Sequence, residues 1–280
     1  MKKYKPTTPS RRGMSGIEYR KVLSGDKPEK KLTRGFRRGS GRNAFGRITQ
    51  RHKGGGVKRR YRDVDFSNGE IGVPARVCTI EYDPNRSGFI ALIAYKNGKK
   101  SYILAPKSLA VGDIIVASED APIATGNRTV LSRIPVGTFV YNVEIKPHGG
   151  AKIARSAGIS AEVVALDNEY AHVKMPSSEV RRVSSRAWAA IGAVSNDEHH
   201  LVVIGKAGRT RKKGIRPTVR GSAMNPVDHP YGGGEGRQGR GIRRAKNVYG
   251  KPVGIGQKTR RPKKYSNTFI VSRRKVGKQR

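Results

Sequence analysis

The sequence predicts an all-β protein in which two small barrels are flanked by long basic extensions. The short runs of strand-forming residues described below predict the strands, and two contrasts between the middle of the chain and its ends predict the division into a core and two arms. Residues 61–200 hold 16 Lys or Arg against 15 Asp or Glu, and 63 of these 140 residues are apolar. Residues 1–60 and 201–280 carry net charges of +17 and +21 out of +39, and only 35 of their 140 residues are apolar. The middle has a globular composition, whereas each end is expected to order only on binding.

Short apolar and β-branched runs between turn residues predict the strands of the middle region. Residues 75–82, 89–95 and 99–106 come first, and Asn97-Gly98 between the last two predicts a hairpin. The further expected strands, in chain order, are 112–118, 136–145, 161–166, 169–175, 179–183 and 201–204, with a turn at Asp167-Asn168. Residues 151–157 and 186–191, around Trp188, are helix candidates.

The spacing of these strands favours small barrels or sandwiches over a parallel sheet. About 140 residues are long for one small barrel, so we expect two. The seam is expected near 126–133, before Ile134-Pro135. The predicted domains are a basic extension (1–60), a first barrel (61–130), a second barrel (131–200) and a basic Gly/Pro-rich extension (201–280).

The composition excludes several classes of protein. A single Cys leaves no disulfide framework and no multi-Cys zinc site. No apolar run approaches the roughly 18 residues of a spanning helix, we expect no secretory signal, and neither arm offers a membrane-binding amphipathic helix. A charge of +39 predicts a large polyanionic partner instead. We expect no cofactor, no metal, no membrane and no small-molecule substrate.

The first candidate site joins the basic arm to the middle region, at residues 47–66. Three glycines without a Cβ would let the backbone approach a phosphate closely, and Arg can hold phosphate through two N–H groups. A flexible solvated linker is the alternative. The expected nucleic-acid-binding residues are Arg51, His52, Lys53, Gly54, Gly55, Gly56, Lys58, Arg59, Arg60 and Arg62.

The second candidate site, residues 205–221, contains no acid and would repel itself at low salt. A nucleic-acid backbone would supply the missing negative charge and release counterions. A solvated surface loop is the alternative. Its expected contacts are Lys206, Arg209, Arg211, Lys212, Lys213, Arg216 and Arg220.

The third candidate, residues 224–237, places Asp228 beside His229 and invites a catalytic interpretation. Neighbours on an extended chain point apart, however, and no nucleophile stands at a recognisable spacing. A rigid loop pressed into an RNA groove fits better, through Met224, Asn225, Asp228, His229, Gly232, Gly233, Gly234 and Arg237. The G-x-G-x-x-G pattern at 234–239 follows no strand of a βαβ unit, and Glu198-His199-His200 lacks further metal ligands.

These segments together resemble the large-subunit ribosomal protein L-two (L2) family, in its bacterial form. The matching stretches occur in the family's order over most of residues 33–237. They are RHKGGGVKRRYRDVDF (51–66), EYDPNRSGFIALIAY (81–95), YILAP (102–106), IPVGTFVYNVE (134–144), ARSAG (154–158), GKAGRTRKKGIRPTVRG (205–221) and MNPVDHPYGGGEGR (224–237). Through them the resemblance adds Asn85, Arg86 and Arg155 to the expected rRNA-binding residues.

The resemblance implies an oligonucleotide-binding (OB) barrel followed by an SH3-like barrel, with both arms threaded into large-subunit rRNA. It also implies a place near the peptidyl transferase centre, and roles in subunit association and tRNA binding. We expect a ribosome of the bacterial cytoplasm, and an organelle's ribosome is the alternative. The implied partners are rRNA, tRNA, the small subunit and neighbouring ribosomal proteins. The family's suggested assistant in peptide-bond formation corresponds to His229, which we interpret as structural or RNA-contacting.

The sequence departs from the family's pattern at several positions. Tyr141 and Tyr231 stand where the family usually has His, and Lys212 stands where it usually has Trp. Residues 238–257 lack the family's P-W-G and are slightly longer. These departures leave the RNA contacts of the C-terminal arm open.

Scaffolding rather than catalysis is the expected activity, with Phe45 and Tyr61 as candidate base stackers or packed side chains. The leading alternative is a non-ribosomal protein that compacts nucleic acid, which the charge alone would fit. An RNA-modifying enzyme would need a nucleophile, a cofactor loop or a metal cluster. A translation factor usually brings a nucleotide-binding domain. The sequence shows none of these.

Overall fold

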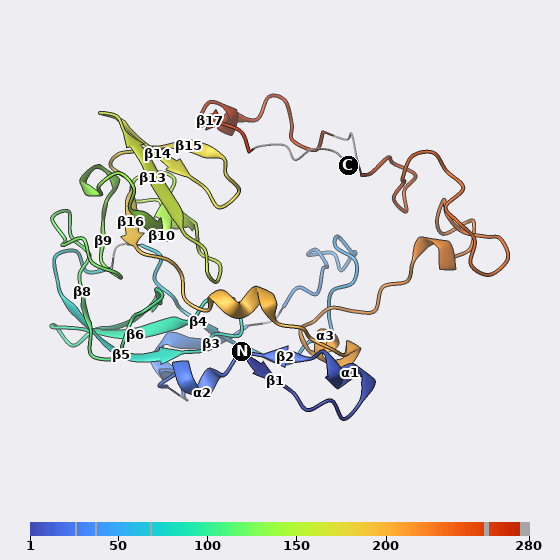
Figure 1. The fold of residues 1–280 in the computed structure, drawn as a ribbon, viewed down its shortest axis with the longest axis horizontal. Helices are drawn as coiled ribbons and strands as arrows, with labels where there is room; N and C mark the ends of the chain where they lie inside the picture. Colours follow the sequence, from blue (N-terminus) through green and yellow to red (C-terminus); the bar gives the residue numbers. More distant parts are fainter. Residues whose placement is uncertain (26, 37, 68, 255–257, 275–280) are drawn as a thin grey trace. The chain divides into compact units, whose positions relative to one another are not determined.

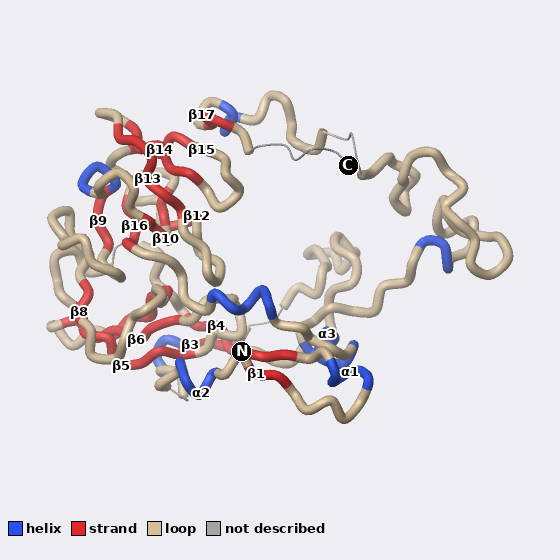
Figure 2. Tube along the Cα trace, viewed as in Figure 1, coloured by secondary structure: helices blue, strands red, loops and turns tan. Residues whose placement is uncertain are grey.

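A computed structural model describes residues 1–25, 27–36, 38–67, 69–254 and 258–274. The chain divides into two compact units. The first comprises residues 1–37, 58–206 and 268–280, and the second comprises residues 38–57 and 207–267. Strands form most of the regular structure of the first unit, and loops dominate the second (Figure 2). The prediction of an all-β fold with two barrel-like sheets is confirmed.

The first barrel is a curled antiparallel sheet with strand order β7-β6-β5-β8 (Figure 1). Its strands are β5 (Ala75–Glu81), β6 (Ile90–Tyr95), β7 (Lys100–Leu104) and β8 (Ile114–Ile115). The hairpin predicted at Asn97-Gly98 joins β6 to β7, and Gly98 adopts a φ of +81° that suits glycine. A two-stranded ladder of β3 (Thr33–Gly35) and β4 (Arg60–Arg62) precedes it, and Val64 then bridges to Tyr102 of β7.

The second barrel is a seven-stranded antiparallel sheet with order β17-β15-β14-β13-β10-β16-β9. Its strands are β9 (Arg128–Val130), β10 (Phe139–Tyr141), β13 (Ala161–Leu166), β14 (Tyr170–Lys174), β15 (Val180–Ser184), β16 (Trp188–Ile191) and β17 (Ile270–Ser272). A separate pair, β11 (Val143–Glu144) and β12 (Ala151–Ile153), lies beside it. The turn predicted at Asp167-Asn168 is confirmed, because Asp167 N donates to Tyr170 O at 2.7 Å. Since β9 pairs with β16, the change of sheet falls between β8 and β9.

Both helix candidates are wrong, because both stretches contain strands. Residues 186–191 contain β16, which pairs with β10 on one side and β9 on the other. All four residues of this central strand are buried, and such an apolar run cannot be told from a buried helix by periodicity. Residues 151–157 contain β12, which ends where Ala154 takes a φ of +52°.

Three predicted strands are shorter or absent. Of residues 112–118, only Ile114 and Ile115 form a strand, β8. The run 136–145 is broken into β10 and β11 at Asn142, whose φ is +52°. Residues 201–204 form no strand, because Leu201 ends a 3-10 helix and Val203 instead exchanges hydrogen bonds with Ser15.

The N-terminal arm packs part of its length on the first barrel. Ile17 and Leu23 contact the core formed by β5 and β6, and Ser24 Oγ accepts a hydrogen bond from Ile80 N at 2.8 Å. The small elements outside the sheets are β1 (Lys2–Lys3), β2 (Ser15–Gly16), α1 (Pro9–Arg12), α2 (Tyr19–Val22), η1 (Lys30–Leu32), η2 (Leu131–Arg133), η3 (Asp197–Leu201), α3 (Ala207–Lys212), η4 (Gly221–Ala223) and η5 (Tyr265–Asn267). An arm too poor in apolar residues to fold alone thus gains part of its order from the barrel.

A buried ion pair organises the second barrel. Glu144 is fully buried, and its carboxylate accepts hydrogen bonds from Arg128 Nη2 at 3.2 Å, His148 N at 3.1 Å and Trp188 N at 3.4 Å. Burial lowers the pKa of the Arg128 guanidinium, and the Glu144 carboxylate opposes that shift. Each charge therefore depends on the other for compensation in the interior.

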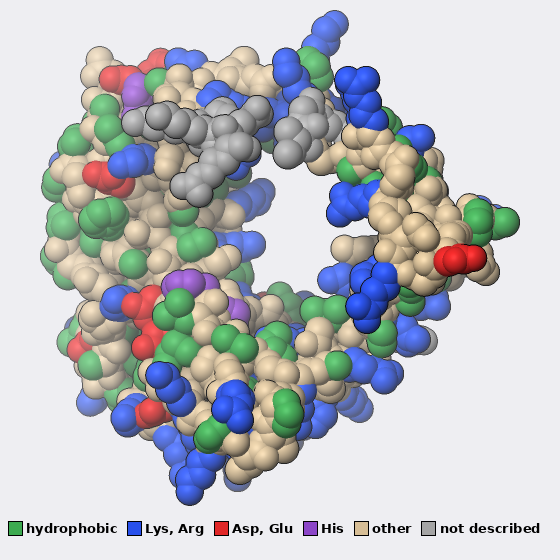
Figure 3. Space-filling view, turned by 45° about the vertical axis from the view of Figure 1, so that its right-hand side comes forward, with side chains coloured by type: hydrophobic (Ala, Val, Ile, Leu, Met, Phe, Trp, Pro, Cys, Tyr) green, Lys and Arg blue, Asp and Glu red, His purple; other side chains and the backbone are tan. Residues whose placement is uncertain are grey.

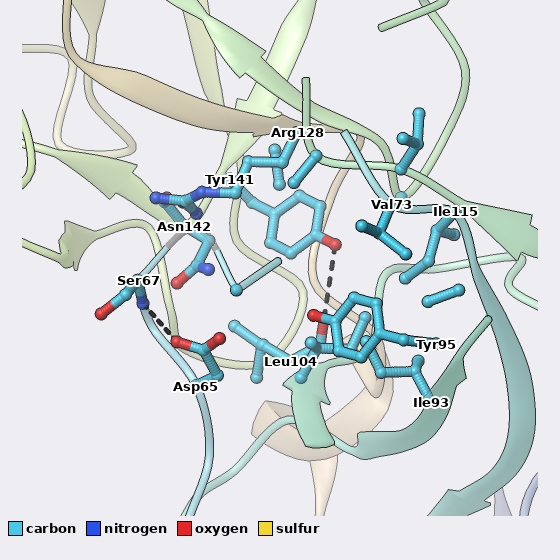
Figure 4. A pocket seen from close by; sticks show the side chains of 17 residues that line it. Asp65, Ser67, Val73, Ile93, Tyr95, Leu104, Ile115, Arg128, Tyr141 and Asn142 are labelled. Carbon is cyan, nitrogen blue, oxygen red and sulfur yellow. Dashed lines mark hydrogen bonds between the residues drawn. The ribbon is translucent and has the colours of Figure 1, made fainter. Parts of the chain in front are cut away.

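The two barrels meet at a cavity of about 50 Å³ (Figure 4). Tyr95 and Ile115 line it from the first barrel, and Tyr141 and Asn142 line it from the second. The Tyr141 hydroxyl donates across this boundary to Leu104 O at 3.3 Å. Burial raises the pKa of that hydroxyl far above its usual value.

Replacing Glu144 with Ala should lower the free energy of unfolding by about 3–5 kcal/mol, because it leaves the Arg128 charge buried without its partner. Chemical denaturation of the full chain measures this change. The exposed Glu119→Ala variant is the control and should stay within about 0.5 kcal/mol of the wild type. Equal stability of the two variants would contradict a structural role for the pair.

Alkaline pH should destabilise the wild type more than the Tyr141→Phe variant. The folded state holds this hydroxyl neutral, so its contribution is complete below the unfolded pKa of about 10 and is lost as pH rises above it. Free energies of unfolding measured from pH 9 to 11 should fall less steeply for Tyr141→Phe. Equal slopes of unfolding free energy against pH for the two proteins would show that Tyr141 does not cause the loss of stability.

Candidate nucleic-acid interface

The basic arms meet in the second unit through a short antiparallel pairing of residues 52–57 with 212–216. Lys53 and Ile215 form the bridge. Gly54 N donates to Gly214 O at 2.9 Å, Val57 N to Lys212 O at 3.0 Å, and Arg216 N to His52 O at 3.1 Å. The first two sequence-predicted sites are therefore parts of one structure, although about 160 residues separate them in the chain.

Glycines make this pairing possible. A Cβ on Gly56 would lie 2.9 Å from Gly214 Cα and 2.8 Å from Arg38 Nη1. Gly214 has a φ of +90°, and its own Cβ would meet the same Arg38 nitrogen at 2.9 Å. The close neighbour of Gly56 is thus a segment of the same chain, and the approach of a phosphate to this triplet stays a prediction.

The cations around this pairing are mostly exposed and have few acids near them in sequence. The second unit contains 22 Lys or Arg but only two acids, Asp228 and Glu235. On the face in Figure 3, the visible Asp and Glu side chains gather mainly over the barrels. The predicted cationic residues exposed in this unit are Arg51, Lys53, Arg211, Lys212, Lys213, Arg216, Arg220 and Arg237, and Arg209 is half-buried. Such a surface suits a polyphosphate backbone.

The loop 224–237 folds around His229 rather than presenting it to Asp228. His229 Nδ1 accepts a hydrogen bond from Tyr231 N at 3.1 Å, and the two rings lie 4.7 Å apart. Asn225 O accepts from both Asp228 N and His229 N, and Gly233 N donates to Met224 O. In the described part of the chain, no hydrogen bond joins the Asp228 carboxylate to the His229 ring. The Asp-His pair of a general base is not assembled here.

In the first unit, several predicted RNA-binding residues surround Asp83, which is fully buried. Arg86 Nε donates to its carboxylate at 2.6 Å, and Arg62 Nη1 lies 3.6 Å from it. Asn85 N and Nδ2 donate to the same carboxylate at 2.9 and 3.1 Å. These contacts hold the turn after β5 in place, so Arg62 and Arg86 are committed to the fold.

An aromatic ring missed in the sequence lies beside this turn. The guanidinium carbons of Arg86 and Arg155 lie 5.2 and 4.4 Å from the centre of the Phe66 ring. Arg59 donates to Pro84 O at 2.6 Å, whereas Lys58, Arg60, Arg155 and Lys206 are exposed. The sequence-predicted residues therefore separate into exposed cations and cations that support the fold.

The two candidate stackers have different surroundings. Phe45 is 88% exposed. Tyr61 is half-buried, with the Arg34 guanidinium 5.0 Å from its ring and Phe36 packed edge-on at 5.7 Å. Of these two rings, Phe45 therefore offers far more exposed surface to a ligand of the size of a base.

Among the described residues, no group of three or more His, Cys, Asp or Glu side chains could hold a metal ion. His199 and His200 lie in η3, where His200 Nδ1 is 2.9 Å from Asp197 O. None of the helices in the described ranges is long and apolar enough to cross a membrane.

Two protein-family models match the chain. The first, described as Ribosomal Proteins L2, RNA binding N-terminal domain, matches residues 29–117. The second, described as Ribosomal Proteins L2, C-terminal domain, matches residues 124–250. The first match covers the β3–β8 region, and the second covers β9 to β16 together with most of the C-terminal arm in the second unit.

Replacing Gly56 with Ala should separate the paired segments, because the new Cβ would collide with the Gly214 backbone. Limited trypsin digestion should then cut faster after Lys212 and Lys213, whereas Pro217 blocks cleavage after Arg216 in every variant. Gly39→Ala is a matched control, since its Cβ would find its nearest neighbour at 3.7 Å and its φ is not positive. Equal cleavage of both variants would contradict the pairing.

Proposed function

The chain belongs to the ribosomal protein L2 family, and on that premise we propose where and how it acts in the ribosome. Members of this family are structural, RNA-binding proteins of the large ribosomal subunit. The proposal is that this chain binds large-subunit rRNA near the peptidyl transferase centre in a cytoplasmic ribosome. There it supports subunit association, tRNA binding and peptide-bond formation as a scaffold, and the rRNA performs the catalysis.

The separation of charge between the two units carries this proposal. Residues 61–200, which form most of both barrels, are almost neutral, whereas the second unit holds 22 cations and two acids. Each phosphate that such a surface neutralises releases counterions, which favours binding at low salt. A near-neutral barrel adds little to that electrostatic attraction, so its contribution is the recognition of RNA shape.

The exposed cations are the residues proposed to contact phosphate. Lys212 and Arg216 stand on the paired segment, with their side chains exposed. Arg62 and Arg86 act differently, because the buried Asp83 carboxylate holds them. Their role is to fix the turn after β5. Arg86 and Arg155 both contact the Phe66 ring, so the surface beside this turn is also held in place.

His229 is proposed to shape its loop rather than to transfer protons. Its Nδ1 already accepts the Tyr231 backbone N–H, and a Cβ on Gly221 would touch its ring at 2.6 Å. The ring therefore fills space between two parts of the arm. A proton acceptor would need a free nitrogen aimed at substrate.

Binding to a large-subunit rRNA fragment should persist at salt concentrations that release random duplex DNA of equal length. Both curves should be steep, since each neutralised phosphate contributes about −0.7 to −0.9 to the slope of log K against log salt. Filter binding over a salt series measures both. Coincident curves would reject rRNA recognition and favour a protein that compacts nucleic acid.

Neutralising two arm cations should flatten the slope measured on rRNA. The variant Lys212→Gln with Arg216→Gln loses two phosphate contacts, so the slope should decrease by about 1.4–1.8. The matched control, Lys96→Gln with Lys152→Gln, removes two exposed cations from the barrels and should leave the slope unchanged. An equal change in the salt slope of both variants would show that the total charge of the chain, and not the position of the cations, determines the slope.

A further inference from the structure

Two loops of the second unit, one from each arm, share a pattern of residues. The first is Arg42–Ile48, with sequence RNAFGRI, and the second is Lys246–Pro252, with sequence KNVYGKP. Each places a cation, Asn, an aliphatic residue, an aromatic residue, Gly and a second cation in the same order. We call them the aromatic loops.

The side-chain amide of Asn closes both aromatic loops in the same way. Asn43 Oδ1 accepts hydrogen bonds from Phe45 N at 3.1 Å and from Arg47 N at 3.0 Å. Asn247 Oδ1 accepts them from Tyr249 N and Lys251 N, both at 3.0 Å. The side chain thus ties down the backbone on both sides of the aromatic residue.

The backbones of the aromatic loops agree as well. Asn43 N donates to Arg47 O at 3.0 Å, and Asn247 N donates to Lys251 O at 2.9 Å. The glycines after the aromatic residues, Gly46 and Gly250, have φ values of +75° and +74°. A single bridge flanks each loop, Arg42 with Ile48 and Lys246 with Pro252.

These constrained loops present their aromatic rings to solvent. Phe45 is 88% exposed and Tyr249 is 71% exposed. The Arg51 guanidinium, which follows the first loop in sequence, lies 5.8 Å from the Tyr249 ring centre. No Asp or Glu occurs between Lys30 and Arg62, or anywhere after Glu235. Each ring is therefore an apolar face with only cations near it in sequence.

The ligand that fits this combination is a flat ring attached to an anion. An unpaired nucleobase offers a face for stacking, and its phosphate can reach the flanking Arg or Lys. A base buried in a duplex cannot stack on the loop without being unpaired. The hydrogen-bonded loop also lowers the ordering cost of binding, because the backbone beneath the ring is already fixed.

We propose that the two aromatic loops are paired stacking sites for unpaired bases of RNA, with Phe45 and Tyr249 as the stacking side chains. The proposal deepens the rRNA-binding function proposed above and rests on it. It assigns the aromatic rings a contribution that does not depend on salt, in addition to the charge of the surrounding arm. The similarity of the loops gives both arms the same kind of contact.

The test compares Phe45→Leu, Tyr249→Leu and the double variant with the wild type, using an rRNA fragment that contains unpaired segments. Each Leu variant keeps an apolar side chain but removes the ring face, and should bind roughly 5- to 150-fold more weakly. The salt slope should not change, because no charge is altered. Phe139→Leu, at an exposed position of β10, is the matched control and should bind like the wild type.

Trp substitutions supply a direct signal of stacking. The chain has one Trp, Trp188, which is buried. The added indole of Phe45→Trp or Tyr249→Trp should keep wild-type affinity and lose fluorescence when RNA with unpaired bases binds. Fully duplex RNA of equal length should leave that fluorescence unchanged.

The outcomes separate this proposal from the proposed function. If the Leu variants bind rRNA as tightly as the wild type while the preference for rRNA over DNA persists, the stacking sites are rejected and the rRNA function stands. Loss of that preference in the wild type rejects the function itself. If the Leu variants lose binding to another protein but not to RNA, the loops are protein-docking sites, and the stacking proposal is overturned.

Discussion

Repulsion among cations is the constraint on which the structure of this chain depends. Twenty-two Lys or Arg share the second unit with two acids, and little apolar surface is available there to offset their repulsion. The barrels avoid the problem because their cations and acids are almost equal in number. Their ion pairs include exposed ones, such as Lys107 with Asp197, and two in which the carboxylate is fully buried, Arg128 with Glu144 and Arg86 with Asp83. The chain thus uses charge in two ways, as ion pairs within the barrels and as a large excess of positive charge in the second unit that suits RNA.

Backbone hydrogen bonds and side-chain-to-backbone hydrogen bonds, rather than a hydrophobic core, hold the second unit together despite this repulsion. Glycines at 56 and 214 let two basic segments pair, with Arg38 against both. Asn43 and Asn247 each close a loop through their side-chain amides. All of these bonds are local or between backbones, so they leave most of the charged side chains exposed. A nucleic-acid backbone can then supply the missing negative charge without displacing a packed interior.

The sequence predicts the features that depend on neighbouring residues and misses those that depend on distant ones. The sequence predicts the hairpin at Asn97-Gly98 and the contrast in charge between the middle of the chain and its ends, because each depends on residues that are close together in the chain. The prediction of a helix around Trp188 is wrong because a central strand that is buried on both faces does not alternate between apolar and polar residues. The pairing of residues 52–57 with 212–216 joins segments that are far apart in the chain, and no pattern of neighbouring residues predicts it. The shared order of residues in RNAFGRI and KNVYGKP is visible in the sequence. The shared hydrogen bonds of the two aromatic loops are visible only in the structure.

The central claim is that the two arms act as one RNA-binding unit, because their backbones pair. Amide hydrogen exchange of the full chain, measured as an rRNA fragment is added, tests it most directly. The account predicts that Gly54, Val57 and Arg216 gain protection together, at the same RNA concentration, while Val163 and Val173 in the barrel core stay protected throughout. Protection of Gly54 and Val57 at RNA concentrations where Arg216 still exchanges freely would contradict it, since the arms would then bind RNA separately.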